Sequence, residues 1–99
     1  MVKHIIIWNF KEELSESERK EAASNIKEGL EGLKGKIDGL EEIKVYANPF
    51  ESSNGDIMLD STFVSEDALK GYQVNPLHIE VATYVRSKVG ERKCFDYEV

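Results

Sequence analysis

The sequence is almost free of cysteine: Cys94 is the single one among 99 residues. An intramolecular disulfide is therefore excluded, and a metal site built on several cysteines is not expected. Long hydrophobic runs are also lacking, because no stretch approaches the roughly 18 apolar residues of a membrane span. The apolar segment at residues 5–8 is too short for a signal peptide. The expectation is a cytoplasmic protein without a membrane partner.

Positive charge is in the minority, with 13 Lys and Arg against 19 Asp and Glu, which gives a net charge of −6. No basic stripe is available to neutralise phosphates, so a nucleic-acid partner is not expected. The same balance disfavours an anionic membrane surface. The length predicts one domain over residues 1–99 with one modest core.

Residues 2–10 are rich in β-branched and aromatic side chains and predict a buried strand. Because side chains alternate along a strand, Ile5 and Ile7 face one way and a second apolar set faces the other. Apolar residues on both faces are typical of a central strand. The second set consists of Val2, His4, Ile6, Trp8 and Phe10.

Further along the chain, capping and turn signals predict three helices and three more strands. The Ser15-x-x-Glu18 capping box predicts a helix that begins at residue 16, with Gly35 as its C-cap. Ser65 predicts a helix over residues 66–73, and Asn75-Pro76 predicts a break and a new helix over 76–89, with Leu77 among its inward residues. Alternating segments predict strands at residues 42–48, 56–64 and 92–99.

The resulting order, β-α-β-β-α-β, predicts an α+β, ferredoxin-like subunit. Its four-stranded antiparallel sheet carries the helices on one face. The other face displays an apolar set, which a stable monomer does not leave in water. We therefore expect a homodimer with the two sheets packed face to face. The residues of this expected interface are Ile5, Ile7, Phe95 and Tyr97.

The first and last strands are expected to be antiparallel neighbours in this fold. Counting from the two chain ends places His4 opposite Asp96 and Ile6 opposite Cys94, all on the helix side of the sheet. The second helical region also turns polar residues toward this side. We therefore expect a pocket between sheet and helices that holds His4, Tyr72, His78 and Asp96.

Three segments resemble the stress-responsive A/B barrel domain family of the dimeric α+β barrel superfamily. They are Lys3-His4-Ile5-Ile6, Tyr72-x-x-Asn75-Pro76-x-His78 and Phe95-Asp96-Tyr97. The resemblance covers essentially the whole chain, in matching order. It implies a ferredoxin-like subunit and a dimer whose sheets form a barrel. The first histidine of the family's H-P-x-H segment is Asn75 here.

Within this family the chain is similar to a plant polyketide cyclase, which performs an aldol cyclisation without a metal or organic cofactor. That similarity implies catalytic roles for four residues, with His78 as general base. Tyr72 would polarise a carbonyl, and Asp96 would fix the tautomer of His4. No cofactor and no metal are expected. We expect the substrate-binding wall to comprise Ile6, Trp8, Leu69, Val81 and Cys94.

Three functions remain open at this point. The first is a family protein that binds a small hydrophobic or carbonyl-containing molecule, with structural histidines. The second is a cofactor-independent acid–base enzyme of the cyclase or aldolase kind. The third is a monooxygenase of the wider superfamily, which uses residue types such as Asn9, Trp8 and His78.

Overall fold

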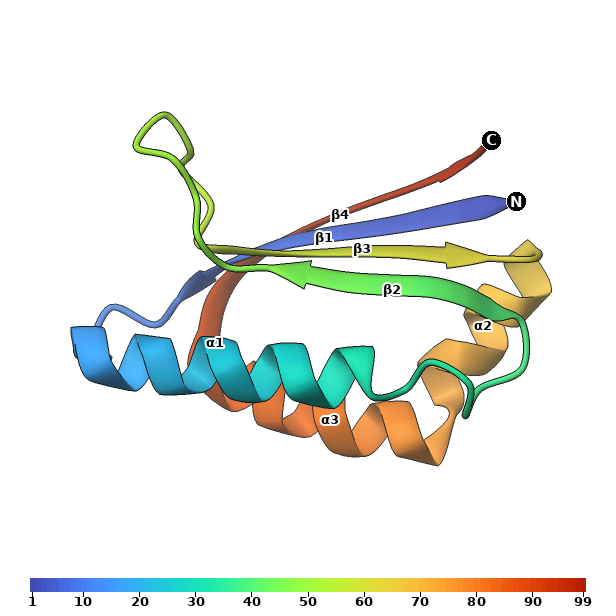
Figure 1. The fold of residues 1–99 in the computed structure, drawn as a ribbon, viewed down its shortest axis with the longest axis horizontal. Coiled ribbons are helices and arrows are strands. Elements are labelled where there is room, and N and C mark those ends of the chain that lie inside the picture. Colours follow the sequence, from blue (N-terminus) through green and yellow to red (C-terminus); the bar gives the residue numbers. More distant parts are fainter.

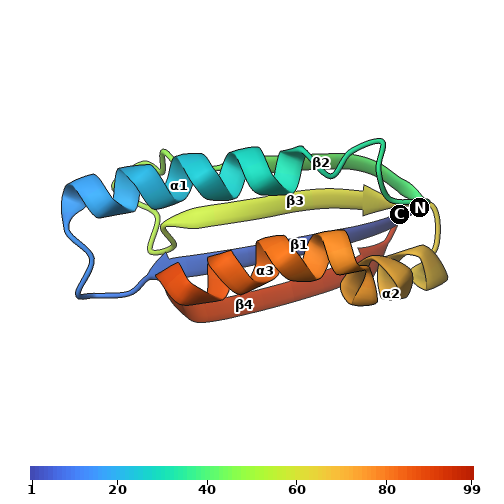
Figure 2. The same ribbon diagram turned by 90° about the horizontal axis from the view of Figure 1, so that it is seen from below.

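The computed structural model describes residues 1–99, which form one antiparallel sheet with three helices on one of its faces (Figures 1 and 2). This is the ferredoxin-like α+β fold expected from the sequence. No helix is both long and apolar enough to cross a membrane. The elements are β1 Val2–Phe10, α1 Glu16–Glu31, β2 Leu40–Tyr46, β3 Ile57–Phe63, α2 Glu66–Val74, α3 Pro76–Lys88 and β4 Val89–Glu98.

The strand order β2-β3-β1-β4 makes β1 a central strand and β4 an edge strand. β1 and β4 run antiparallel with His4 opposite Asp96 and Ile6 opposite Cys94, so the expected register is confirmed. Residues of the two strands that face the helices therefore lie side by side. The amide of Val99 donates to the carbonyl of Met1 at 2.9 Å, which joins the two chain ends.

α1 begins at the predicted capping box, where Ser15 Oγ accepts from the amide of Glu18 at 3.2 Å. The helix buries Ala22, Ile26 and Leu30 against the sheet. The helix ends at Glu31 rather than near Gly35, because Gly32 already acts as its C-cap. Gly35 instead adopts a positive φ of 83° in the following turn, a conformation that favours glycine.

The Asn75-Pro76 step joins α2 directly to α3. Asn75 Oδ1 accepts from the amide of Leu77 at 2.9 Å, and Pro76 occupies the first turn of α3, as expected. Leu77 itself is 44% exposed, unlike the prediction, and the inward stripe starts one turn later. There Val81 packs against Gly29 of α1, where no side chain separates the two helices.

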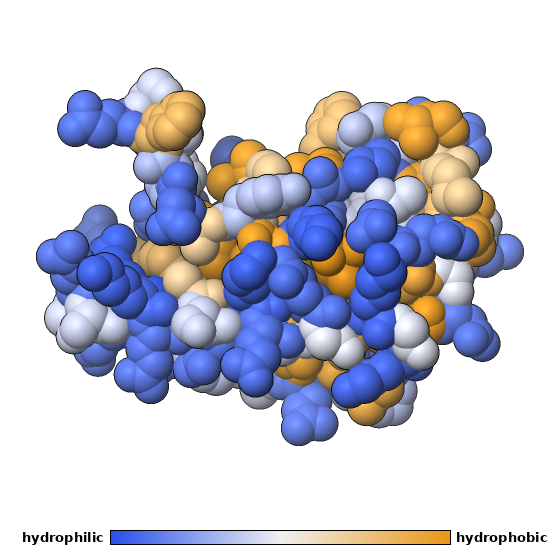
Figure 3. Space-filling model, in the orientation of Figure 1, coloured by the Kyte–Doolittle hydropathy of each residue, from blue (hydrophilic) through white to orange (hydrophobic).

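The core lies between the sheet and the helix layer, and the opposite sheet face is open. Phe95 on that open face is 68% exposed, and Tyr97 beside it is 41% exposed. The loop of residues 47–56 between β2 and β3 rises from the same side (Figure 1), and its Phe50 is 84% exposed. Figure 3 shows this loop as a projection, with hydrophobic side chains exposed on the same upper side of the molecule.

Candidate functional site

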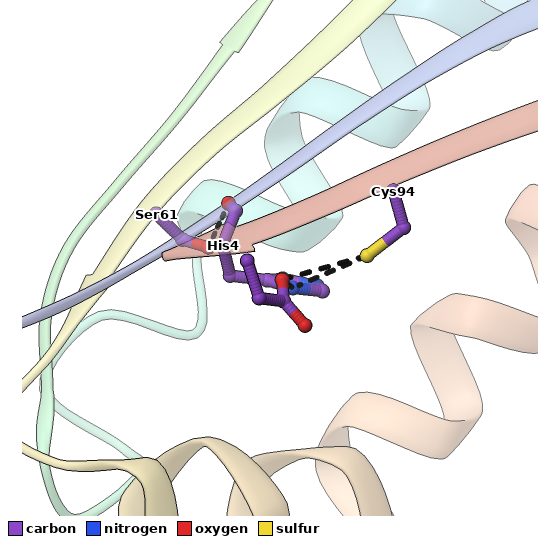
Figure 4. Close-up of polar contacts among 4 residues, drawn as sticks. His4, Ser61 and Cys94 are labelled. Carbon is purple, nitrogen blue, oxygen red and sulfur yellow. Dashed lines mark hydrogen bonds and ion pairs between the residues drawn. The ribbon is translucent and has the colours of Figure 1, made fainter. Parts of the chain in front are cut away.

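His4 is held inside the protein by contacts on several sides. The residue is 2% exposed, and its Nδ1 atom is hydrogen-bonded to the carboxylate of Asp96. Ser61 Oγ donates to the backbone carbonyl of His4 at 2.9 Å and fixes this part of β1 against β3. Figure 4 shows His4 and Cys94 directing their side chains into the space between the sheet and the helices.

Tyr72 connects the two histidines. Its ring centroid lies 4.0 Å from that of His78, with 34° between the planes, and 6.3 Å from that of His4. Tyr72 is fully buried, yet its hydroxyl has no hydrogen-bond partner, and neither does the buried Nδ1 of His78. Two buried polar atoms without partners are unusual, because each costs about 1–3 kcal/mol of desolvation.

A cavity of about 550 Å³ opens beside His78, between the sheet and α3. Most of its lining is apolar, and β1, β3, α1, α3 and β4 all contribute to it. This volume is within the range of small-molecule pockets. The lining residues are Ile6, Trp8, Leu30, Leu59, His78, Ala82, Val85, Arg86, Val89, Gly90 and Arg92.

Burial shapes the protonation of the site. It lowers the pKa of His78, and the positive charges of Arg86 and Arg92 act in the same direction, while the Gln73 backbone opposes them. His78 is therefore neutral at physiological pH and able to accept a proton. Burial also raises the pKa of Tyr72, which keeps its hydroxyl protonated as a donor.

Cys94 does not form a nucleophile relay with His4 and Asp96. Its Sγ lies 3.8 Å from His4 Nδ1 and donates to Asp96 Oδ1 at 3.4 Å, so one ring nitrogen faces both partners. A relay instead uses the two different nitrogens of the ring. Burial and Asp96 raise the pKa of the Cys94 thiol, which disfavours a reactive thiolate. The ligand atoms of these three residues lie within 4.8 Å of one another, a set that could hold a metal ion.

The structure brings together only some of the residues predicted for the site. His78, Ile6 and Trp8 line the cavity, while His4 and Tyr72 are buried in contact with one another. Asp96 and Cys94 pair with His4. Leu69 lies in the core, Val81 packs on α1 and Cys94 lies beside His4. None of these three predicted wall residues lines the cavity.

Eight of the eleven cavity residues were missed by the sequence reasoning, and two of these, Arg86 and Arg92, are charged. A signal for Arg92 was available, because alternation places it on the same face of β4 as Cys94 and Asp96. Arg86 gave no such signal, since an arginine in the last turn of a helix is also explained by the helix dipole.

Fold and site together define a ferredoxin-like α+β protein with a largely apolar cavity beside a buried histidine–tyrosine cluster. Residues 2–99 match the stress responsive A/B barrel domain, and the chain belongs to this family. The match covers the whole fold described above. No curated protein matches the chain.

Three solved structures illustrate the range of similar proteins. A dimeric protein of unknown function from Bacteroides fragilis shares 28% identity, with a TM-score of 0.92 over 99% of this chain and 95% of that one. A hydroxynitrile lyase from Passiflora edulis shares 17% identity, with a TM-score of 0.73 over 97% and 90%. An antibiotic biosynthesis monooxygenase shares 9% identity, with a TM-score of 0.77 over 100% and 98%. The last two similarities show the fold alone.

Proposed function

We propose that this chain binds a small hydrophobic or carbonyl-containing molecule in the cavity between the sheet and α3. The observation that carries the proposal is the apolar cavity beside His78, a residue with a buried, unpartnered nitrogen. A carbonyl group of the ligand would lie beside His78, and an apolar body would cover Ile6 and Trp8. A polar contact to His78 would offset part of the cost of its unpartnered nitrogen.

Native mass spectrometry of freshly purified protein tests the binding proposal, since a bound small molecule adds mass that is lost on denaturation. Trp8 offers a second readout, because it is the only tryptophan and it lines the cavity. We expect its fluorescence to change when hydrophobic ketones are added to ligand-free protein. The proposal would be contradicted if the purified protein carries no bound small molecule and its Trp8 emission does not change with any of a broad panel of such compounds.

A second candidate function is a cofactor-independent acid–base enzyme of the cyclase or aldolase kind. The stacking of Tyr72 on His78 favours it, because a proton donor and a neutral base then lie side by side. His78 would take a proton from a carbon next to a carbonyl, and Tyr72 would stabilise the developing enolate. The Asp96 carboxylate would fix the tautomer of His4. The monooxygenase alternative gains no such observation, since Asn9 donates to the Asn54 carbonyl instead.

Turnover of short polyketides and related carbonyl compounds by wild type and His78→Ala tests the enzyme candidate. Loss of a general base lowers the rate by about 10²–10⁴-fold. Ser87→Ala, on the exposed side of α3, is the matched control and should retain full activity. A substrate panel on which wild type and His78→Ala perform equally would remove the candidate.

We also propose that two copies of the chain pair through the open sheet face. The face carries Ile7, Phe95 and Tyr97 in exposed positions, and the rings of Phe95 and Tyr97 lie 5.7 Å apart. The similar protein from Bacteroides fragilis is described as dimeric, which supports this arrangement. A second sheet would remove these apolar surfaces from water. The loop with Phe50 stands beside the same face and would border the partner.

Light scattering after size exclusion tests the pairing. Wild type should elute with twice the 11.3 kDa mass of the chain, and Phe95→Lys should shift it to the monomer. Ile79→Lys is the control, because Ile79 is 46% exposed but lies in the helix layer. A wild-type mass of one chain at micromolar concentration would contradict the pairing.

A further inference from the structure

The apolar cavity has a cationic side. Arg86 in the last turn of α3 and Arg92 on the helix-facing side of β4 both line it, together with His78. The remaining lining residues carry no charge. Both arginines are exposed residues, so they form a charged rim on an otherwise apolar cavity.

Neither arginine forms an ion pair within the chain. The paired carboxylates of the protein contact Lys3, His4, Arg19, Lys27 and Lys34, and none contacts Arg86 or Arg92. Acidic side chains outnumber basic ones by 19 to 13, so partners are abundant in the sequence. Both guanidinium groups are thus free for an anion from outside the chain.

We infer that the cavity binds amphipathic carboxylates: the carboxylate pairs with Arg86 and Arg92, and the hydrophobic body lies against Ile6, Trp8 and Leu59. This rests on the proposed binding function and names its ligand class. The planar fork of a guanidinium matches the two oxygens of a carboxylate. The influence of both arginines on the pKa of His78 agrees with their closeness to the cavity.

The orientation of the ligand in the cavity follows from this arrangement. The charged group lies at the β4 and α3 side, and the body points toward the β1 and β3 residues of the lining. Neutral hydrophobic molecules of the same length would fill the apolar part only and leave both arginines unpaired.

Binding of octanoate and of 1-octanol at a pH near 8, followed through Trp8 fluorescence, tests the inference. Hydrogen bonds to charged groups are worth about 1.5–3 kcal/mol. We therefore expect octanoate to bind at least about tenfold more tightly than 1-octanol. The two probes share the alkyl body, so the difference reports the carboxylate alone.

Charge variants of the full chain then assign the preference to the two arginines. Arg86→Gln and Arg92→Gln should each weaken octanoate binding about tenfold and leave 1-octanol binding unchanged. Arg86→Lys should recover part of the affinity, because it keeps the charge but loses the fork. Lys88→Gln removes a cation two residues from Arg86 that does not line the cavity, and it should change neither affinity.

The outcomes separate this inference from the proposed function. If 1-octanol binds as tightly as octanoate, or if Lys88→Gln lowers octanoate affinity as much as Arg86→Gln does, the inference is overturned while the cavity remains a binding site. If neither probe nor any hydrophobic ketone changes Trp8 emission, the proposed binding function falls, and the inference falls with it.

Discussion

Removing the hydroxyl of Tyr72 should stabilise the protein. The Tyr72 side chain is fully buried, and its hydroxyl has no hydrogen-bond partner. Folding therefore strips this group of water without replacing the lost hydrogen bonds, at a cost of about 1–3 kcal/mol. In Tyr72→Phe the ring keeps its packing on His78 and Phe63, whose centroids lie 4.0 and 4.9 Å away.

The expected gain is about 1 kcal/mol in the free energy of unfolding, because a small void at the former hydroxyl offsets part of the benefit. For a domain of this size that gain corresponds to a rise of about 4–8 °C in Tm. Urea denaturation followed by circular dichroism measures the free energy directly, and the slope m should not change, since the same surface is exposed on unfolding.

Tyr84→Phe is the matched control, because the hydroxyl of Tyr84 accepts from Asn25 Nδ2 at 3.0 Å. Its removal should lower the free energy of unfolding, by about 0.5 kcal/mol at this exposed site. If Tyr72→Phe is destabilised like Tyr84→Phe, the Tyr72 hydroxyl has a partner in the folded protein and the reasoning fails. Stabilisation combined with weaker binding of carbonyl compounds would show that the hydroxyl serves a ligand.

Three further variants probe the backbone and the histidine. Asn75→Ala should lose about 1 kcal/mol of unfolding free energy with the cap on Leu77, and an unchanged urea midpoint would contradict this. Gly39→Ala should lower the Tm far more than Gly35→Ala. Both glycines have φ of 83°, but only a Cβ at position 39 would meet Ala68, at 2.5 Å. Equal Tm values for the two variants would refute this clash. Because burial lowers the pKa of His78, the unfolded chain protonates first as the pH falls through about 6.5, and stability should drop there. His78→Asn should make the free energy of unfolding depend less on pH in this range. A variant whose stability falls with pH as steeply as that of the wild type would argue against the lowered pKa of His78.

The relation of β1 to β4 could be predicted from the sequence because few physical choices were open. Both strands alternate, their ends coincide with the chain ends, and one face has to be apolar. Counting from Met1 and Val99 therefore placed His4 opposite Asp96, as the structure has it. The same alternation predicted that Phe95 and Tyr97 lie on the opposite, open face of the sheet.

The contact of Tyr72 with His78 could be anticipated only as a shared side of the molecule. Asn75 and Pro76 predict where α2 ends and α3 begins, but their spacing does not give the angle between the two helices. That angle depends on packing against the sheet, and it decides that the two rings stack at 4.0 Å. The end of α1 at Glu31 was missed because Gly35, and not Gly32, was taken as its C-cap.

The alternation of β4 gives this one strand two roles. Arg92, Cys94 and Asp96 face the cavity side, whereas Phe95 and Tyr97 face the proposed partner. α3 passes into β4 without an intervening loop, since Lys88 ends the helix and Val89 begins the strand. One inserted or deleted residue near this junction would turn the aromatic side chains inward and the Asp96 carboxylate outward. We therefore expect members of this family that share both roles to keep the length of this segment fixed, while the loop of residues 47–56 is free to vary.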